Sequence, residues 1–365
     1  MKGDELRVKS WGWVLRVYCF GWRFFMSIVM TGGGTGGHLA IVRAVKEQLV
    51  VDGNGDTKLV YIGSTQGQDQ KWFADDDDFE ARYFLQTKGV VNQRGIGKLN
   101  SLWMLFKATI KACKLLKQHK AKVVFSVGGF SSAATAFAAL SMRIPLVIHE
   151  QNAALGSLNK LLKPFAKYFI SSYLPDSPVR AYPIKEIFFD KARIRSSIKS
   201  VIFVGGSQGA VSINKLALEL AQTLHDRGIS IIHQAGERNI EQVKAEYEKL
   251  GIEAEVFGFT DRLAEYMSMA DLAIARAGAS TLWELSANAL PTLFIPYPYA
   301  ASDHQYYNAQ FLLEKDLAWL MRESQIDKDK IIALLDENLE SKSKGLKELI
   351  QKDGAKQIAK LLESF

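Results

Sequence analysis

Three glycine-rich segments are the parts of this sequence best suited to bind a charged ligand. They are residues 32–38 (GGGTGGH), 128–132 (GGFSS) and 205–210 (GGSQGA), and each follows a short apolar run. Glycine lets the backbone approach a ligand closely and adopt positive φ. A helix that begins after such a loop presents free N–H groups and the positive end of its dipole. Three loops of this kind predict a phosphate-rich site divided between two halves of the chain, whereas one alone is also typical of a tight strand-to-helix turn.

The first loop does not favour a nicotinamide cofactor. Gly32, Gly34 and Gly37 fit the pattern G-x-G-x-x-G, which is weak support when it stands alone. A dinucleotide site usually has an acidic residue at the end of the second strand, and here no acid follows residues 61–62 before Asp69. The pattern G-x-x-x-x-G-K-[ST] is absent. An NAD oxidoreductase and an ATP-driven phosphate loop are therefore disfavoured.

Four consecutive polar residues, His149, Glu150, Gln151 and Asn152, come directly after an apolar run. Such residues are poor core material at the end of a buried strand, so we expect them to line a cleft. The alternative is a turn that is capped by its own side chains.

A second polar segment, residues 276–284 (RAGASTLWE), leads from another apolar run into a helix. Its small residues leave N–H groups open to phosphate. Glu284, one turn into that helix, is suited to accept from two ribose hydroxyls, although an ordinary solvated carboxylate is the alternative. Gln305 follows Asp303 before a further helix and is suited to bind sugar hydroxyls, whereas Asp303 is suited to an N-cap.

The sequence offers little support for metal or disulfide chemistry. Its cysteines are Cys19 and Cys113 alone, which fits a reducing cytoplasm, and no Cys or His spacing indicates a metal site. Residues 75–78 (DDDD) contain the D-x-D spacing of metal-dependent glycosyltransferases. Their flanks show no strand end, so we interpret the run as a solvated helix end. We expect no metal and no cofactor.

The elements that must position these residues alternate between strands and helices, which predicts parallel sheets with helices on both faces. The expected strands are residues 27–30, 58–62, 123–127, 146–149, 168–171, 200–204, 230–233, 255–257, 272–275 and 292–295. Expected helices include residues 38–49, 213–225, 240–249, 345–350 and 355–363. The fold class is α/β, with two Rossmann-like domains that face a cleft.

Length and composition agree with two domains. The chain has 365 residues, 48% of them hydrophobic, and no apolar run reaches the roughly 18 residues of a spanning helix. The pattern restarts after an irregular stretch, so we expect domains at residues 26–185 and 186–340, followed by helices at 341–365 that pack back towards the junction. Residues 1–25 form an extension outside the core. Met26 is a second candidate for the start, and a membrane-interface anchor is the alternative for the extension.

Two segments, residues 1–25 and residues 88–122, carry the excess of basic residues behind the net charge of +7. The second contains nine basic residues and no acidic one. Apolar residues recur there at near-helical spacing: Leu99, Leu102, Trp103, Phe106, Ile110 and Leu115. This pattern favours a basic amphipathic helix on an anionic membrane surface. A core-packed helix with a lysine face is the main alternative. A nucleic-acid face has no recognition motif to support it, so no nucleic-acid partner is expected.

In combination, the three glycine loops, residues 149–152, residues 278–284 and residues 304–305 resemble the MurG family over residues 26–365. The resemblance implies a two-domain B-type glycosyltransferase of peptidoglycan synthesis, and thus a role in cell shape and division. It implies inverting transfer of N-acetylglucosamine from UDP-N-acetylglucosamine to undecaprenyl-diphospho-muramoyl-pentapeptide. It also implies a peripheral location on the cytoplasmic face of the inner membrane, with other cell-wall synthesis proteins as further partners.

The resemblance also implies a set of donor-binding positions in this chain. They are Thr35, Gly36, Gly37, Asn152, Lys185, Ser207, Thr260, Ala279, Ser280, Thr281, Leu282, Trp283, Glu284 and Gln305. Lys185 stands where the family has arginine, and Arg180 is a rival match for that position. His38 is the candidate catalytic base, with Glu150 or His149 as the alternative. A soluble UDP-N-acetylglucosamine epimerase, another UDP-sugar glycosyltransferase and a non-catalytic membrane scaffold remain the rival functions.

Overall fold

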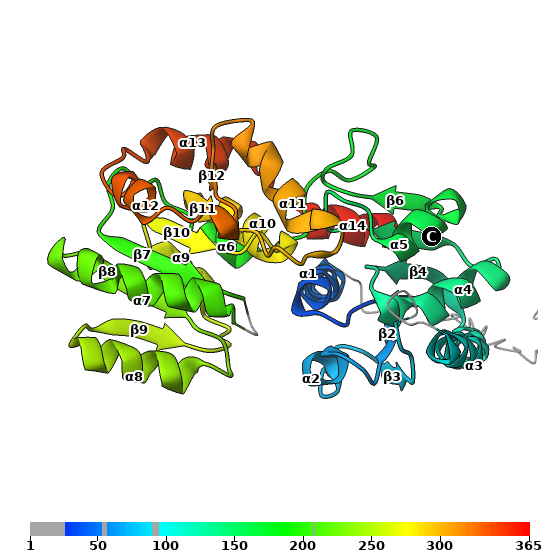
Figure 1. Cartoon of the computed structure of the whole chain (residues 1–365). Coiled ribbons are helices and arrows are strands. Elements are labelled where there is room, and N and C mark those ends of the chain that lie inside the picture. Colours follow the sequence, from blue (N-terminus) through cyan, green and yellow to red (C-terminus); the bar gives the residue numbers. More distant parts are fainter. Residues whose placement is uncertain (1–25, 53–56, 90–94, 207–208) are drawn as a thin grey trace, which may run out of the picture.

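The structure is a computed structural model that describes residues 26–52, 57–89, 95–206 and 209–365. The expected extension at residues 1–25 therefore lies outside the described residues, and so does Ser207. Within the described ranges the chain forms two α/β domains, each built on one six-stranded sheet (Figure 1). In these ranges no helix has both the length and the apolar character that a bilayer crossing requires.

The first sheet has the strand order β3-β2-β1-β4-β5-β6, and all of its pairs are parallel. Its strands are β1 (Ser27–Thr31), β2 (Lys58–Ser64), β3 (Ala81–Leu85), β4 (Ala121–Ser126), β5 (Leu146–His149) and β6 (Tyr168–Ile170). Its helices are α1 (Gly36–Asp52), α2 (Asp69–Phe73), α3 (Ile96–Gln118), α4 (Ala133–Ser141) and α5 (Ser157–Leu162). Helices cover both faces, so the middle residues of the central strands, 28–30 of β1 and 123–125 of β4, are apolar and buried.

The second sheet repeats this order as β9-β8-β7-β10-β11-β12, again with parallel pairs. Its strands are β7 (Ser200–Val204), β8 (Ser230–Gln234), β9 (Ala254–Phe257), β10 (Leu272–Ala275), β11 (Thr292–Phe294) and β12 (Trp319–Leu320). Its helices are α7 (Val211–Asp226), α8 (Ile240–Leu250), α9 (Leu263–Met269), α10 (Ala279–Ala287), α11 (His304–Leu313) and α12 (Lys328–Leu334).

The strand order changes direction between β1 and β4 in the first sheet and between β7 and β10 in the second. At such a point the connections leave to opposite sides and open a crevice at the carboxyl ends of the strands. The glycine loops at residues 32–37, 128–129 and 205–206 and the turn at residues 276–278 are the segments that follow these four strands. Topology therefore places the predicted ligand loops at the two crevices.

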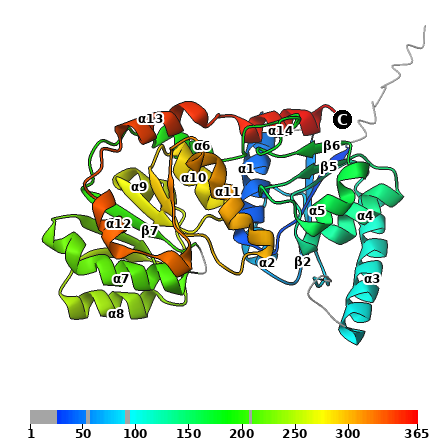
Figure 2. The same cartoon turned by 45° about the horizontal axis from the view of Figure 1, so that its top comes forward.

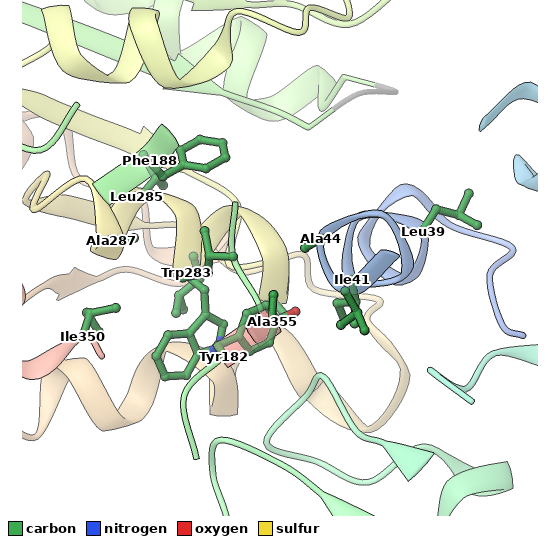
Figure 3. Close-up of a cluster of buried hydrophobic side chains, with 14 of the residues drawn as sticks. Leu39, Ile41, Ala44, Tyr182, Phe188, Trp283, Leu285, Ala287, Ile350 and Ala355 are labelled. Carbon is green, nitrogen blue, oxygen red and sulfur yellow. The ribbon is translucent and has the colours of Figure 1, made fainter. Parts of the chain in front are cut away.

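The connection between the domains includes α6 (Glu186–Asp190), and the chain ends in α13 (Glu340–Leu349) and α14 (Gly354–Glu363). Helix α14 returns to the first domain and packs against α1 (Figures 1 and 2). At the junction the rings of Tyr182 and Trp283 stack with centroids 5.1 Å apart. Figure 3 shows Ile41 of α1 next to this pair. One continuous apolar cluster therefore runs from the first domain into the second.

All ten predicted strands are confirmed, with ends that move by at most two residues. The edge strands β3 and β12 were not predicted. Four of the five residues of β3 and both residues of β12 are only partly buried, and β12 is only two residues long. The predicted helices are also confirmed, and most extend further than expected, as α1 does at both ends.

Candidate functional site

A cavity of about 480 Å³ lies between the domains. It brings together most of the predicted site residues, although they come from distant parts of the sequence. Those that line it are Thr35, Gly36, Gly37, Gln151, Asn152, Lys185, Thr260, Ala279, Ser280, Thr281, Glu284 and Gln305. The third glycine loop contributes Gly205 and Gly206, whereas Ser207 falls outside the described residues. The second glycine loop, residues 128–132, does not line the cavity, so the expectation of three loops at one site is wrong for that loop.

Two helices begin at this cavity and pack against each other. Helix α1 starts at Gly36 and α10 starts at Ala279, and neither has an acidic residue in its first turn. The first N–H groups of a helix lack partners within the helix and carry its positive dipole end. The Ser280 hydroxyl donates to the Gly37 carbonyl at 3.1 Å and so joins the two helix starts. This arrangement is suited to a diphosphate held between the domains.

Asp69 fixes the shape of the first glycine loop. Its carboxylate is fully buried and accepts from the Gly34 N–H at 2.8 Å, the Ser64 N–H at 3.0 Å and the Tyr61 hydroxyl at 3.1 Å. A side chain at Gly33 would collide with this carboxylate. The sequence analysis considered Asp69 only in relation to a dinucleotide site and did not predict that it holds the glycine loop. The signal for this role was an acidic residue shortly after the second strand.

His38 lies just inside α1, one residue beyond the last glycine that lines the cavity, but it does not itself line the cavity. The Thr35 hydroxyl is 2.9 Å from its Nδ1, and the Gln151 side-chain nitrogen is 3.0 Å from its Nε2. Burial, with a smaller effect of His304, lowers the pKa of His38 to about 4. The imidazole is therefore neutral at physiological pH, which is the form that accepts a proton.

Only half of the polar run after β5 faces the cavity. Gln151 and Asn152 line it, as expected, whereas His149 and Glu150 do not. The Glu150 carboxylate accepts from the N–H groups of Asn152 and Gly156 and from the Asn159 amide, at 2.9–3.0 Å. The expectation that all four residues line the cleft is thus wrong. Glu150 shapes the loop that presents Asn152, which is the self-capped turn given as the alternative.

His149 is completely buried, and its ring packs edge-on against Tyr182. Burial, with a smaller effect of His38, lowers the pKa of His149 to about 3, so the ring is neutral. Because His149 has no exposed surface, whereas His38 is partly exposed, His149 is poorly located to meet a substrate hydroxyl.

Glu284 lines the cavity one turn into α10 and has an unusual ionisation. Burial raises the pKa of its carboxyl to about 7, and the nearby Lys185 acts in the opposite direction. Lys185 lines the cavity and forms an ion pair with Glu47 of α1 at 2.7 Å. Arg180 is exposed and is not among the lining residues. Of the two candidates for the cationic position, the structure therefore brings Lys185 to the cavity.

Three further predicted residues present polar groups to the cavity. Gln305 accepts from the Tyr297 N–H at 2.9 Å through its side-chain oxygen, which leaves its NH₂ group for a ligand. The Thr260 hydroxyl accepts from the Arg262 N–H at 3.0 Å and holds its own turn. The Asn152 side-chain oxygen accepts from Asn308 at 3.1 Å. Asn308 was missed, since one polar residue on the buried face of a helix gives no motif.

Two predicted binding residues have side chains that belong to the core. Leu282 is fully buried and Trp283 is 7% exposed, and neither lines the cavity. Trp283 instead donates to the Tyr173 hydroxyl at 3.1 Å and stacks on Tyr182 and Phe311. Any contact of these two residues with a ligand would therefore come from their backbone.

The acidic run at residues 75–78 is not a simple solvated helix end. Helix α2 ends at Phe73, and beyond it both oxygens of Asp76 and one of Asp78 accept from Lys46, at 2.6–2.7 Å. Lys46 is 4% exposed, so its charge needs these partners. The expectation missed this pairing because the lysine lies 30 residues earlier in the sequence.

Two protein-family models together match most of the described chain. Residues 28–170 match the glycosyltransferase family 28 N-terminal domain, and residues 200–363 match the family 28 C-terminal domain. A relative from Sulfurovum sp. (strain NBC37-1) is 70% identical over 340 residues, which are 93% of this chain and 99% of the relative. That relative is named UDP-N-acetylglucosamine--N-acetylmuramyl-(pentapeptide) pyrophosphoryl-undecaprenol N-acetylglucosamine transferase.

Solved structures share the two-domain architecture. The crystal structure of Acinetobacter baumannii MurG matches with a TM-score of 0.74 and 27% identity, over 93% of this chain and all of that one. A UDP-GlcNAc 2-epimerase from Neisseria meningitidis matches with a TM-score of 0.59 and 12% identity, over 93% of this chain and all of that one. At 12% identity the likeness extends to the fold alone, so the fold by itself does not separate a transferase from an epimerase.

Proposed function

Because this chain belongs to glycosyltransferase family 28, we propose that it transfers N-acetylglucosamine from UDP-N-acetylglucosamine to undecaprenyl-diphospho-muramoyl-pentapeptide, with inversion at the anomeric carbon. The observation that carries this proposal is the interdomain cavity, where the starts of α1 and α10 meet beside Glu284 and Gln305. The name of the relative at 70% identity supports the same donor and acceptor.

In this proposal, the domain at residues 186–340 binds most of the donor. The domain at residues 26–185 binds the acceptor and faces the membrane. The N–H groups at the starts of α1 and α10 bind the diphosphate and stabilise the charge that develops on the departing UDP. Glu284 accepts from the ribose hydroxyls, Thr260 reads uracil through its backbone, and the Gln305 amide binds the sugar. Residues 341–365 form the strap that returns to the first domain.

His38 is proposed as the base of the transfer step. The acceptor hydroxyl oxygen forms a bond to the anomeric carbon, its proton passes to a ring nitrogen of His38, and the bond from that carbon to the UDP oxygen breaks. UDP leaves with the bonding electron pair. The neutral ring has a nitrogen lone pair that can take this proton, and His38, with a pKa lowered to about 4 by burial, is in this form at physiological pH. Glu150 is a weaker candidate because its oxygens already accept three hydrogen bonds.

Helix α3 supports attachment to an anionic membrane surface. Five of its large apolar residues are between 44% and 68% exposed: Leu99, Leu102, Trp103, Phe106 and Ile110. Exposed lysines accompany them, including Lys98, Lys107 and Lys111. A packed helix with a solvated lysine face does not account for this apolar row, whereas a peripheral helix inserts such a row between lipids and places lysines at the headgroups. We therefore place the enzyme on the cytoplasmic face of the inner membrane, within reach of other cell-wall synthesis proteins.

The alternative is a soluble UDP-N-acetylglucosamine epimerase or another UDP-sugar glycosyltransferase of the same fold. The deciding assay supplies labelled UDP-N-acetylglucosamine and a lipid-linked muramoyl-pentapeptide to the wild type, His38→Ala and Glu284→Ala. We expect a labelled lipid product from the wild type, loss of product with retained UDP binding in His38→Ala, and weak donor binding in Glu284→Ala. Release or epimerisation of the donor without a lipid product would favour the alternative.

A further inference from the structure

The cavity has a second set of contacts between the domains at the end where Thr260 lies, and these contacts have no part in the site described so far. Trp72 of α2 and Phe259, in the loop after β9, meet edge to face with ring centroids 6.3 Å apart. Arg43 of α1 and Asp261 of the same loop are 3.8 Å apart. All four residues line the cavity. We refer to Arg43, Trp72, Phe259 and Asp261 together as the clasp.

The two first-domain members of the clasp support each other. The Arg43 guanidinium lies over the Trp72 ring, 4.3 Å from the ring centroid, and its side chain is 24% exposed. A cation on an aromatic face fixes the position of both groups. Phe259 is 39% exposed, so its ring is held by neighbours at the cavity rim and not by a core. Lys71 adds a second cation 5.6 Å from the Phe259 ring centroid.

The clasp is separate from the buried junction between the domains. In Figure 1, α11 and α14 connect the domains at the top, whereas α2 lies at the bottom. The junction contains buried stacked rings, such as the Tyr182–Trp283 pair. In the clasp, Arg43 and Trp72 are partly exposed, whereas Phe259 and Asp261 are exposed, and the Asp261 side chain is 83% exposed. Contacts of this kind are weak enough to break and reform during a catalytic cycle.

We propose that Arg43 and Trp72 are positioning residues that hold the Phe259–Asp261 loop closed over the nucleotide end of the cavity and thereby set how long UDP stays bound. This inference rests on the proposed donor site, because Thr260 lies within that loop. The clasp contacts exist only while the domains are closed at this end. A nucleotide bound between closed domains leaves after they part, so losing the clasp accelerates its release.

The test measures release of a fluorescent UDP analogue from the full chain, after mixing with excess UDP, by stopped-flow fluorescence. We expect release to be about tenfold faster in Trp72→Ala and about threefold faster in Arg43→Ala, as one aromatic and one cationic contact are lost. Trp72→Phe retains a ring and should stay close to wild type. In the transfer assay, KM for the donor should rise in Trp72→Ala while kcat is unchanged or higher.

Arg227→Ala provides the matched control. Arg227 forms a similarly exposed ion pair with Asp336, at 2.9 Å, and neither residue lines the cavity. This variant should release UDP at the wild-type rate. A charge exchange, Arg43→Asp with Asp261→Arg, should restore slower release relative to Arg43→Asp alone, which general loosening of the fold would not do.

The outcomes separate the clasp from the proposed function. If the wild type binds UDP and transfers sugar, but Trp72→Ala and Arg43→Ala release UDP at the wild-type rate, the clasp is overturned and the function stands. Equal acceleration in Trp72→Phe and Arg227→Ala would also overturn it, because the effect would then be unspecific. A wild type that binds no UDP would overturn both proposals.

Discussion

The Asn308 side chain is hydrogen-bonded to Asn152 across the two domains. Its NH₂ group donates to the Asn152 side-chain oxygen at 3.1 Å and to the Ala277 carbonyl at 3.2 Å, and its oxygen accepts from the Ala153 N–H at 2.9 Å. Asn308 is fully buried. A single amide of the second domain thus fixes the first-domain loop that brings Asn152 to the cavity.

Replacing Asn308 should therefore weaken both the fold and the site. Asn308→Ala leaves the Ala153 N–H and the Ala277 carbonyl without their partner, and each unpaired buried group costs about 1–3 kcal/mol. We expect the free energy of unfolding to fall by about 2–6 kcal/mol for the two groups together, measured by urea denaturation, and KM for the donor to rise. Gln222→Ala removes an exposed amide that bonds only Asp226 and should change neither quantity. Wild-type stability in Asn308→Ala would contradict the bridging role.

Asp69 should be needed for the shape of the first glycine loop. Asp69→Asn keeps the size of the side chain but turns an NH₂ group towards one of the three donors that the carboxylate accepts from. We expect a loss of about 1–3 kcal/mol in the free energy of unfolding and weaker UDP binding by titration calorimetry. Asp226→Asn, in which an exposed carboxylate is changed, serves as the control. Unchanged UDP binding would show that the loop keeps its shape without Asp69.

Donor binding should depend on pH through Glu284, whose pKa burial raises to about 7. The ionised carboxylate is the better acceptor for ribose hydroxyls, so UDP affinity should rise about tenfold between pH 6 and pH 8. Glu284→Gln should bind UDP more weakly and lose this dependence. Lys185→Met should move the midpoint to higher pH, because Lys185 holds the pKa down. A flat profile in the wild type would contradict the assignment.

The Glu284 carboxyl should also make the stability of the fold depend on pH. Stability should fall as the pH rises, whereas UDP affinity should increase. The pKa of this carboxyl in the folded chain lies above its ordinary value of 4.5, so the folded chain binds the proton more tightly. Stability from this group is present below pH 4.5 and is lost as the pH rises to about 7. Urea denaturation of the wild type without ligand should therefore show a larger decrease over this range than Glu284→Gln. Parallel profiles for the two chains would contradict the raised pKa.

The exposed row on α3 should control membrane attachment without affecting the donor site. Trp103→Glu with Phe106→Glu removes two stacked rings from the surface and adds negative charge. We expect loss of sedimentation with anionic phospholipid vesicles and unchanged UDP binding. Val211→Glu, at a site that is 75% exposed in the second domain, is the control and should still sediment. Equal sedimentation of both variants would contradict the role of the α3 row in membrane attachment.

The sequence alone determined the elements and the residue types of the site. Apolar runs such as residues 200–204 are buried on both faces wherever parallel strands are covered by helices, so local pattern was enough to find them. The first and third glycine loops and Glu284 were also found locally, because each lies in a short run of neighbouring residues that reaches the cavity. The row of apolar residues on α3 was likewise found from local spacing, but only the structure shows that these side chains are exposed.

Only the tertiary structure decided which polar groups face the cavity and which hold the scaffold. Glu150 and Asn152 are two residues apart, yet one accepts hydrogen bonds from its own loop and the other lines the site. Lys46 with Asp76, Asn152 with Asn308 and Trp72 with Phe259 are pairs separated by 30 to 187 positions. Contacts at such separations arise when sheets and domains pack, and neither periodicity nor spacing along the chain records them.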